Sequence, residues 1–339
     1  MKPPLQEIIY LSAQDVGATG VDVAAVIEIV ERVLSLHDKD RVTLPPKVVL
    51  DLDEKRHGRI NAMPAYVGGN VNMCGIKWIA GFPNNPVRHN LPRANALIIL
   101  NDPQTGMPLA ILDATRISAL RTGAVTGVGA RYLARADARR VAFVGAGVQA
   151  RTQLEALKSV LPGINEMRIF DTRREVAQDF VNHCSASYDG VAVGITENPE
   201  LAVRHADIVV TATVADEPIV KADWLKPGVF FSHVGSYQEE EEAVILQADK
   251  VVVDIWEEVL HRRTPLLARM FEAGTIDHSR IHANMGEIIN GDKSGRETAD
   301  ERIFFSPLGL GSEDIAVAAN IYQRAIDMKL GLPIPFGQS

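Results

Sequence analysis

A strand-like run that leads directly into a glycine-rich turn and then into a helix constrains the fold of this chain more than any other feature. The apolar run 141–144 (VAFV) is followed by Gly145, Gly147 and Ala150, in the pattern G-x-G-x-x-A. In such a turn the first glycine allows a tight bend, the second lets the backbone approach a pyrophosphate, and the alanine lets the helix pack closely on the strand. The helix N-terminus offers amide donors to phosphates. Because it lies between a strand and a helix, the turn predicts a dinucleotide site; a glycine-rich loop without a ligand is the alternative.

The segments after this turn alternate between strand-like and helix-like patterns. Short apolar runs, bounded by glycine, proline or aspartate, recur between amphipathic stretches. Such alternation is typical of an α/β protein with a doubly wound parallel sheet of the Rossmann type. The expected strands are 141–145, 167–171, 191–195, 208–212, 229–234 and 251–254, and the expected helices are 149–161, 174–185 and 199–205.

The first third of the chain carries a different pattern. Two strand-like runs, 96–101 and 108–113, flank the turn 101–106 (NDPQTG) and predict a hairpin. With three earlier runs they indicate an α+β unit that contains an antiparallel sheet. The earlier strands are expected at 48–51, 59–63 and 75–80, and further helices at 21–37, 117–133 and 313–328.

Length and composition limit the partners and the compartment. A chain of 339 residues is longer than one hydrophobic core usually serves, so two domains are expected. The net charge of −8 argues against a nucleic-acid partner, which needs a basic surface. Two distant cysteines, Cys74 and Cys184, form neither a disulfide framework nor a metal cluster, and no apolar run is typical of a signal peptide or a membrane span. We therefore expect a cytoplasmic protein with no metal site and no membrane contact.

An acidic residue at the end of the second strand of the alternating region bears on the choice of dinucleotide. In this place the carboxylate of Asp171 would bind the ribose hydroxyls of NAD and repel the 2′-phosphate of NADP. Arg173 and Arg174 follow, and either could meet a phosphate or begin a solvated helix. The pattern favours NAD over NADP.

Four cationic residues in the expected first domain have apolar neighbours, namely Lys47, Lys77, Arg93 and Arg121. A lysine in the apolar strand 75–80 (GIKWIA) is costly to bury unless it is paired, so Lys77 either faces solvent or belongs to a charged site. Arg121 lies in a helix rich in alanine and glycine, where it forms either a structural ion pair or a fork for a carboxylate. Together the four predict a pocket for a small molecule that carries carboxylates.

Short motifs spread over nearly the whole chain resemble those of the ornithine cyclodeaminase/mu-crystallin family. They are MP at 63–64, GIKW at 75–78, NDP at 101–103, ALRTGA at 119–124, the glycine turn, TATV at 211–214 and GLGSEDI at 309–315. The resemblance implies a substrate-binding and dimerisation domain built from both chain ends, residues 1–128 and 313–339, and an NAD-binding domain over 129–312. It also implies a homodimer.

Carried over residue by residue, the resemblance implies roles for the cationic residues and for the residues around the glycine turn. Lys77 would be the active-site lysine, and Arg121 would bind the substrate carboxylate close to the nicotinamide, so both are candidate catalytic residues. Lys47 stands where cyclodeaminases have an arginine, which keeps the charge but loses the bidentate fork. The other substrate candidates are Met63, Arg93, Leu308 and Gly309. The cofactor candidates are Arg121, Thr122, Gly145, Gly147, Val148, Gln149, Asp171, Arg173, Thr211, Thr213, Val234, Gly235 and Ser236.

One departure from the family pattern narrows the chemistry. Cyclodeaminases place a catalytic aspartate just after the glycine that follows strand 229–234, whereas Gly235 is followed here by Ser236 and Tyr237. The acids at 239–242 come later and are expected to form a solvated face. A cyclising attack would then lack its general base, which favours an amino-acid or secondary-amine dehydrogenase over a cyclodeaminase. An imine reductase and a non-enzymatic binding role remain alternatives.

Four longer runs narrow the expected substrate. They are GIKWIAGFPNNP, RANALIILNDPQTG, EPIVKADWLKPG and GDKSGRETADE. They most resemble a branch of the family that converts an opine-like secondary amine with three carboxylates into 2,3-diaminopropionate, a siderophore precursor, and 2-oxoglutarate. Such a substrate suits a pocket with several cations. Of the remaining residues, His233 is expected to be a hydrogen-bonded structural histidine, and Asp314 to cap or anchor the last helix.

Overall fold

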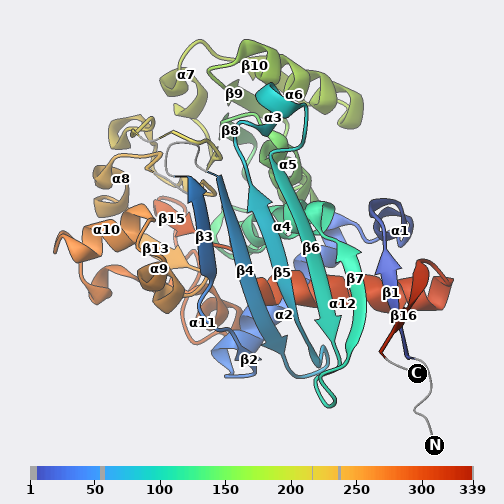
Figure 1. Cartoon of the computed structure of the whole chain (residues 1–339). Helices are drawn as coiled ribbons and strands as arrows, with labels where there is room; N and C mark the ends of the chain where they lie inside the picture. Colours follow the sequence, from blue (N-terminus) through green and yellow to red (C-terminus); the bar gives the residue numbers. More distant parts are fainter. Residues whose placement is uncertain (1–5, 54–57, 216, 236–237, 338–339) are drawn as a thin grey trace, which may run out of the picture. The chain divides into compact units, whose positions relative to one another are not determined.

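The computed structural model describes residues 6–53, 58–215, 217–235 and 238–337 (Figure 1). The chain divides into two compact units: unit 1 comprises Met1–Arg121 and Leu310–Ser339, and unit 2 comprises Thr122–Gly309. The divisions fall inside helix α4 (Thr115–Leu133) and just before helix α12 (Gly311–Met328), a few residues earlier than boundaries at 128 and 312. In the described part of the chain, no helix is long and apolar enough to cross a bilayer.

Unit 2 is built on a parallel sheet of eight described strands, in the order β10-β9-β8-β11-β12-β15-β13-β14. The chain leaves β8 toward one edge and later returns beside it to continue toward the other edge. This arrangement confirms the doubly wound, Rossmann-type sheet. The strands are β8 (Arg140–Val144), β9 (Glu166–Phe170), β10 (Ala192–Ile195), β11 (Ile208–Thr211), β12 (Phe230–His233), β13 (Lys250–Val253), β14 (Ala283–Asn284) and β15 (Ile303–Ser306).

Burial on both faces explains why the strands of unit 2 read as continuous apolar runs. Every residue of the central strands β11, β12 and β15 is buried. Strand β15, a run of four residues (IFFS), pairs between β12 and β13, so the expectation that the strand series ends at 251–254 was wrong. The α-helices wholly within unit 2 are α5 (Val148–Val160), α6 (Arg174–Ser187), α7 (Pro199–Val203), α8 (Glu242–Leu246), α9 (Trp256–Arg262), α10 (Leu266–Glu272) and α11 (Met285–Asn290).

Unit 1 contains a second sheet, with the described strands in the order β16-β1-β7-β6-β5-β4-β2 and β3 paired to β4. Its pairs are antiparallel, including the expected β6–β7 hairpin, except that β1 runs parallel to β7. Both ends of the chain enter this sheet, because β1 pairs with β16. The strands are β1 (Gln6–Leu11), β2 (Val42–Thr43), β3 (Val48–Asp53), β4 (Gly58–Val67), β5 (Met73–Gly81), β6 (Ala94–Asn101), β7 (Pro108–Asp113) and β16 (Leu332–Phe336), and the shorter helices are α1 (Ala13–Ala18), α2 (Val23–Asp38) and α3 (Asn85–His89).

The two faces of the sheet in unit 1 differ in what covers them. On the inner face, Met63, Lys77, Ile98 and Leu112 lie opposite one another across β4 to β7, and all four are buried. Helix α12 crosses this face against β4, β5 and β6 and packs on α2 (Figure 1). The outer face leaves several large apolar side chains exposed, Trp78 among them. Side-chain alternation along β5 therefore turns Lys77 toward α12.

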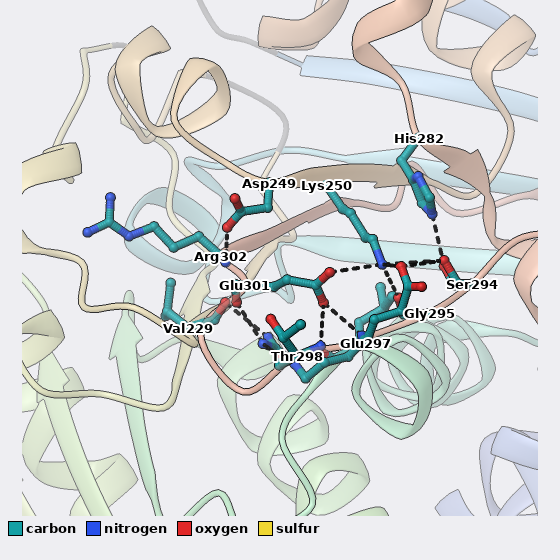
Figure 2. Close-up of polar contacts among 12 residues, drawn as sticks. Val229, Asp249, Lys250, His282, Ser294, Gly295, Glu297, Thr298, Glu301 and Arg302 are labelled. Atoms are coloured by element: carbon teal, nitrogen blue, oxygen red, sulfur yellow. Dashed lines mark hydrogen bonds and ion pairs between the residues drawn. The ribbon is translucent and has the colours of Figure 1, made fainter.

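The buried Lys250 binds the segment that precedes β15 through hydrogen bonds and ion pairs (Figure 2). Lys250, the first residue of β13, donates to the carbonyl of Gly295 at 2.6 Å and pairs with Glu297 at 2.6 Å and Glu301 at 3.1 Å. Glu301 also accepts from the backbone N–H of Glu297 at 2.8 Å. The side chains of Lys250 and Glu301 are both largely buried. This network ties the segment to the sheet at the start of β13, opposite the edge at which the parallel strands end.

We expect Lys250→Met to lower the free energy of unfolding by roughly 2–3 kcal/mol, because methionine keeps the apolar stem but leaves the Glu301 carboxylate without its cation. Denaturant unfolding measures the effect. Lys293→Met is the matched control, since Lys293 is exposed in the same segment, and it should leave stability almost unchanged. Equal stabilities for the two variants would show that the network contributes nothing.

Candidate active site

The buried lysine of β5 is the centre of a charged cluster in unit 1. The side chain of Lys77 is 0% exposed. Its Nζ donates to Asp314 of α12 and lies 3.4 Å from Oγ of Ser118 in α4. The solvent-facing alternative for Lys77 is therefore wrong, because α12 covers the strand face to which it points.

Helix α12 brings two carboxylates to this cluster from the far end of the chain. Arg121 Nε donates to Asp314 Oδ1 at 3.2 Å, and Arg121 Nη1 lies 3.5 Å from Glu313 Oε2. Asp314 thus bridges Arg121 and Lys77 through its two oxygens. Glu313 Oε2 also accepts from the backbone N–H of Leu310 at 3.1 Å. Glu313, rather than Asp314, caps the helix, and Asp314 anchors it through the two cations.

Burial controls the protonation of Lys77. Removal from water, together with the nearby Arg121 cation, lowers the pKa of Lys77 from 10.5 to about 8, although Asp314 and Glu313 oppose this shift. A pKa this close to neutrality suits a group that accepts or delivers a proton during a reaction. The guanidinium of Arg121 is a planar fork of donors, a geometry that matches a carboxylate. The cluster therefore combines a proton carrier with a carboxylate binder.

The first turn of α12 is held in place from two sides. Nε2 of His37 in α2 lies 2.9 Å from Oγ of Ser312, and burial lowers the pKa of His37 to about 4. At Gly311, an added Cβ would meet the backbone carbonyl oxygen of Met63 at 2.9 Å. Met63, one of the predicted substrate residues, therefore lies against the start of α12 and opposite Lys77 in the β4–β5 register.

The other two predicted cations lie near strand ends. Lys47 is half-buried immediately before β3, and Arg93 is exposed immediately before β6. Their part in substrate binding stays a prediction.

Leu308 and Gly309, also predicted to touch the substrate, follow β15 and are held by a buried carboxylate that was not among the predicted site residues. Asp254 Oδ2, just after β13, accepts from the backbone N–H groups of Leu308 at 2.7 Å and Gly309 at 2.8 Å. Burial raises the pKa of Asp254, although its backbone hydrogen bonds oppose the shift. An aspartate at a strand end is a common pattern, so only the three-dimensional contact distinguishes this one.

The glycine turn after β8 has the geometry that its sequence predicts. Gly145 adopts a φ of 96°, and an added Cβ would meet the carbonyl oxygen of Ala212 at 2.6 Å, so only glycine fits there. Gly147 is the N-cap of α5, and an added Cβ there would meet no atom within 4 Å. Val148 at the first turn is exposed, whereas Ala150 is buried against the sheet. Open space thus lies in front of the N-terminus of α5, as a bound pyrophosphate requires.

Asp171 links the end of β9 to this turn. Its Oδ2 accepts from the backbone N–H of Ala146 at 2.9 Å, and its Oδ1 accepts from the backbone N–H of Arg173 at 2.9 Å. The exposed Arg173 guanidinium lies 3.8 Å from the same Oδ1. The carboxylate therefore stands beside the glycine turn, where a ribose is bound in dinucleotide sites of this kind.

The remaining described cofactor candidates of unit 2 lie at or after the ends of β11 and β12, or in helices α4 and α5. Thr211 ends β11 and is fully buried, whereas Thr213 is half-buried, so Thr213 is the better placed of the two. Val234 and Gly235 follow β12 and are half-buried, while Ser236 lies outside the described residues. Gln149 is half-buried in α5, and the carbonyl of Thr122 accepts from Gln153 at 3.1 Å.

Two of the four acids after β12 are buried, so the expectation of a solvated face was wrong for Glu239 and Glu240 and holds for the exposed Glu242. Glu239 is 0% exposed and Glu240 is 1% exposed. Glu240 Oε2 lies 2.8 Å from Nδ1 of His233, which makes His233 the hydrogen-bonded histidine that was expected. Burial would lower the pKa of His233, but the Glu240 carboxylate outweighs it and raises that pKa to about 9. The pair is therefore a buried ion pair next to the end of β12.

Comparison with known proteins places these features in one family. The model of the ornithine cyclodeaminase/mu-crystallin family matches residues 7–329. The N-((2S)-2-amino-2-carboxyethyl)-L-glutamate dehydrogenase of Staphylococcus aureus is 33% identical over 96% of this chain and 98% of its own, and the alanine dehydrogenase of Archaeoglobus fulgidus is 35% identical over 97% and 99%. Among solved structures, the Δ1-pyrroline-2-carboxylate reductase of Thermococcus litoralis, in complex with NADH and L-proline, matches with a TM-score of 0.90 at 33% identity, covering 96% of this chain and 100% of that one. An archaeal alanine dehydrogenase dimer with bound NAD matches with a TM-score of 0.88 at 34% identity, covering 98% and 100%.

The fold and the two sites define an α/β protein that carries a dinucleotide-type turn in one unit and a buried lysine–arginine–carboxylate cluster in the other. The chain belongs to the ornithine cyclodeaminase/mu-crystallin family.

Proposed function

We propose that this chain is an NAD-dependent dehydrogenase that oxidises the Cα of an opine-like secondary amine, with N-(2-amino-2-carboxyethyl)-L-glutamate as the substrate and 2,3-diaminopropionate and 2-oxoglutarate as the products. The class, an NAD-dependent oxidoreductase acting on amino acids, rests on the family and on relatives that act on such substrates or bind NAD or NADH. The particular substrate rests on the named Staphylococcus aureus relative and on the cationic residues of unit 1. We place the enzyme in the cytoplasm, which fits two free cysteines.

The observation that carries this proposal is the buried Lys77 with its pKa lowered to about 8. When bound, NAD supplies the acceptor for the hydride that leaves Cα. The substrate nitrogen must lose a proton as its carbon is oxidised, and the neutral amine of Lys77 is the base placed to take it. Asp314 holds this amine in position through its hydrogen bond, while burial and the nearby Arg121 cation keep its pKa within reach of neutrality. Water then adds to the imine carbon, and the C–N bond breaks to give the keto acid and the free amine.

The carboxylates of the substrate fit the cations in unit 1. Arg121 would hold the carboxylate next to the reacting carbon, with Met63 beside it on the inner face. Lys47 and Arg93 would hold the other two carboxylates. Leu308 and Gly309, whose backbone N–H groups Asp254 holds, stay candidate substrate residues of unit 2.

In unit 2, the residues around the glycine turn fit NAD. The open approach to Gly147 and Val148 suits the pyrophosphate, and Asp171 suits the adenosine ribose. A carboxylate at this position disfavours the 2′-phosphate of NADP, which supports NAD as the cofactor.

An alternative is the cyclodeaminase reaction of the family, in which ornithine gives proline and ammonia. The missing aspartate after Gly235 argues against it, and Glu239 does not replace that acid, because Glu239 is buried with both oxygens on backbone N–H groups. A second alternative is an alanine dehydrogenase or imine reductase, which the relatives of that activity favour.

One set of assays separates these functions. Purified protein with NAD and N-(2-amino-2-carboxyethyl)-L-glutamate should form NADH and 2-oxoglutarate in equal amounts. Absence of NADH with this compound, but not with alanine or proline, would overturn the substrate assignment and keep the class. Proline and ammonia formed from ornithine without net NADH would establish the cyclodeaminase reaction instead.

We further propose a homodimer formed through the outer face of the sheet in unit 1. Val48, Trp78, Leu97 and Ile99 leave large apolar areas exposed on this face, and Trp78 pairs with Leu97 across β5 and β6. A contiguous apolar face of this kind marks an interaction surface. The related archaeal alanine dehydrogenase is a dimer.

Trp78→Glu is expected to convert this dimer into a monomer, because it places a charge in the centre of the apolar face. Light scattering coupled to size exclusion measures the mass. Val87→Glu, at the exposed Val87 of α3, is the control and should leave the dimer intact. If the Trp78→Glu protein remains dimeric, the dimer interface does not lie on this outer face.

A further inference from the structure

Glu239, four residues after Gly235, joins two segments of unit 2 that leave the sheet at the same edge. Strands β11 and β12 are parallel neighbours, with Thr211 beside His233, so the segments after them start side by side. The Glu239 carboxylate accepts from the backbone N–H of Thr213 after β11 and from that of Gly235 after β12, the second at 3.0 Å. One fully buried carboxylate thus holds the backbone at Thr213 and at Gly235.

The packing at Gly235 shows that the contact between Gly235 and Glu239 depends on the absence of a side chain at position 235. An added Cβ at Gly235 would lie 2.0 Å from a carboxylate oxygen of Glu239. Gly235 does not have a positive φ, so backbone conformation alone does not require glycine here. The space above Gly235 is taken by the Glu239 carboxylate, which makes the two residues interdependent.

The segment that carries Glu239 is itself held firmly. The carbonyl of Glu239 accepts from the backbone N–H groups of Ile219 at 2.9 Å and Val220 at 3.0 Å. Its neighbour Glu240 forms the buried ion pair with His233 at the end of β12. The carboxylate of Glu239 is therefore presented from a fixed backbone: both its oxygens accept from amides, and its Oε2 also lies 3.6 Å from Nδ1 of His233.

We propose that Glu239 is a positioning residue for NAD: by holding the backbone at Thr213 and Gly235, it keeps the two segments in the conformation that binds the nicotinamide half of the cofactor. The inference rests on the proposed NAD-dependent function, and on Thr213, Val234 and Gly235 as cofactor residues. It assigns no proton transfer to Glu239. Hydrogen bonds from backbone amides to a buried carboxylate are strong enough that their loss should be visible in cofactor affinity.

The test is NADH binding to the full-length protein, followed by fluorescence, with Glu239→Gln as the main variant. Glutamine can accept from one amide but turns an N–H₂ donor toward the other, so the Kd for NADH should rise about 10- to 100-fold. The KM for NAD should rise by a similar factor, with a smaller change in kcat. Glu242→Gln, at an exposed acid of the same run, is the matched control and should bind NADH as the parent does.

Gly235→Ala provides an independent test, because its Cβ should displace the carboxylate. The single variant should weaken NADH binding, whereas in a Glu239→Ala background it should add little. Additive losses would overturn the proposal, as would a Glu239→Gln protein that binds NADH with the parent Kd. A Glu239→Gln protein with a lowered melting temperature and an unchanged Kd would also overturn it and leave Glu239 a purely structural residue. If the parent protein itself does not bind NADH, the proposed function fails, and this inference fails with it.

Discussion

Replacing Lys77 with methionine is expected to lower kcat/KM by about 10²- to 10⁴-fold, the range in which a positioned acid or base contributes to a reaction. Methionine fills most of the space of the lysine stem on the inner face of β5 but cannot carry a proton. Asp314 keeps Arg121 as its partner in the variant, so the remaining carboxylate is not left without a cation. The loss should therefore appear in turnover, with the chain still folded.

Two measurements separate loss of chemistry from loss of structure. NADH binding should be almost unchanged in Lys77→Met, because the residues that fit NAD lie in unit 2. Lys39→Met, at an exposed lysine just after α2 in unit 1, should keep full activity. A Lys77→Met enzyme with more than about a tenth of parental kcat/KM would remove Lys77 from the reaction.

The local sequence pattern was sufficient for the elements that Lys77 and the glycine turn belong to. Alternation in GIKWIA predicts a strand, and the run VAFV before Gly145 predicts a strand that leads into a helix; both are present. These patterns depend on neighbours a few residues apart, which is the range over which side-chain periodicity is visible. The β6–β7 hairpin and the parallel sheet of unit 2 were predictable for the same reason.

The contacts that make up the candidate site lie beyond that range. Lys77 and Asp314 are separated by 237 positions, and alternation alone left Lys77 with two possible faces. Only α12, from the other end of the chain, decides between them. The burial of Glu239 was hidden for a related reason: four consecutive glutamates look like a solvated face, and the amides that stabilise this carboxylate come from segments after two different strands.

Replacing Asp314 with asparagine is expected to change both the stability of the fold and the pH dependence of the reaction. Asp314 bridges two buried cations, so its loss leaves Lys77 without its carboxylate partner and Arg121 with the longer contact to Glu313. Removing one partner from a buried ion pair costs about 3–5 kcal/mol, and we expect about 3 kcal/mol here because Lys77 can respond by losing its proton. Denaturant unfolding of Asp314→Asn near neutral pH measures this loss. Asp327→Asn, exposed on the same helix, serves as its control.

The same substitution should move the rising limb of the pH profile. In the oxidative direction Lys77 acts as a base, so kcat/KM of the parent should rise with pH and level off above about 8. Asp314 raises the pKa of Lys77, whereas burial and Arg121 lower it. Without the aspartate, only the lowering influences and the distant Glu313 remain, so the limb should lie roughly 1–3 pH units lower. An unmoved limb in Asp314→Asn would mean that a group other than Lys77 titrates.

The free energy of unfolding should also depend on the titration of Lys77, and it should increase with pH. The pKa of Lys77 is about 8 in the folded protein and returns to its usual 10.5 on unfolding, so between these values the unfolded chain binds more protons. The free energy of unfolding contributed by Lys77 should therefore rise with pH across that window and stay constant below it. In Asp314→Asn the rise should begin at a lower pH, because the folded-state pKa is lower still. In Lys77→Met this contribution should vanish, which ties the titrating group in the unfolding curves to the one in the activity profile.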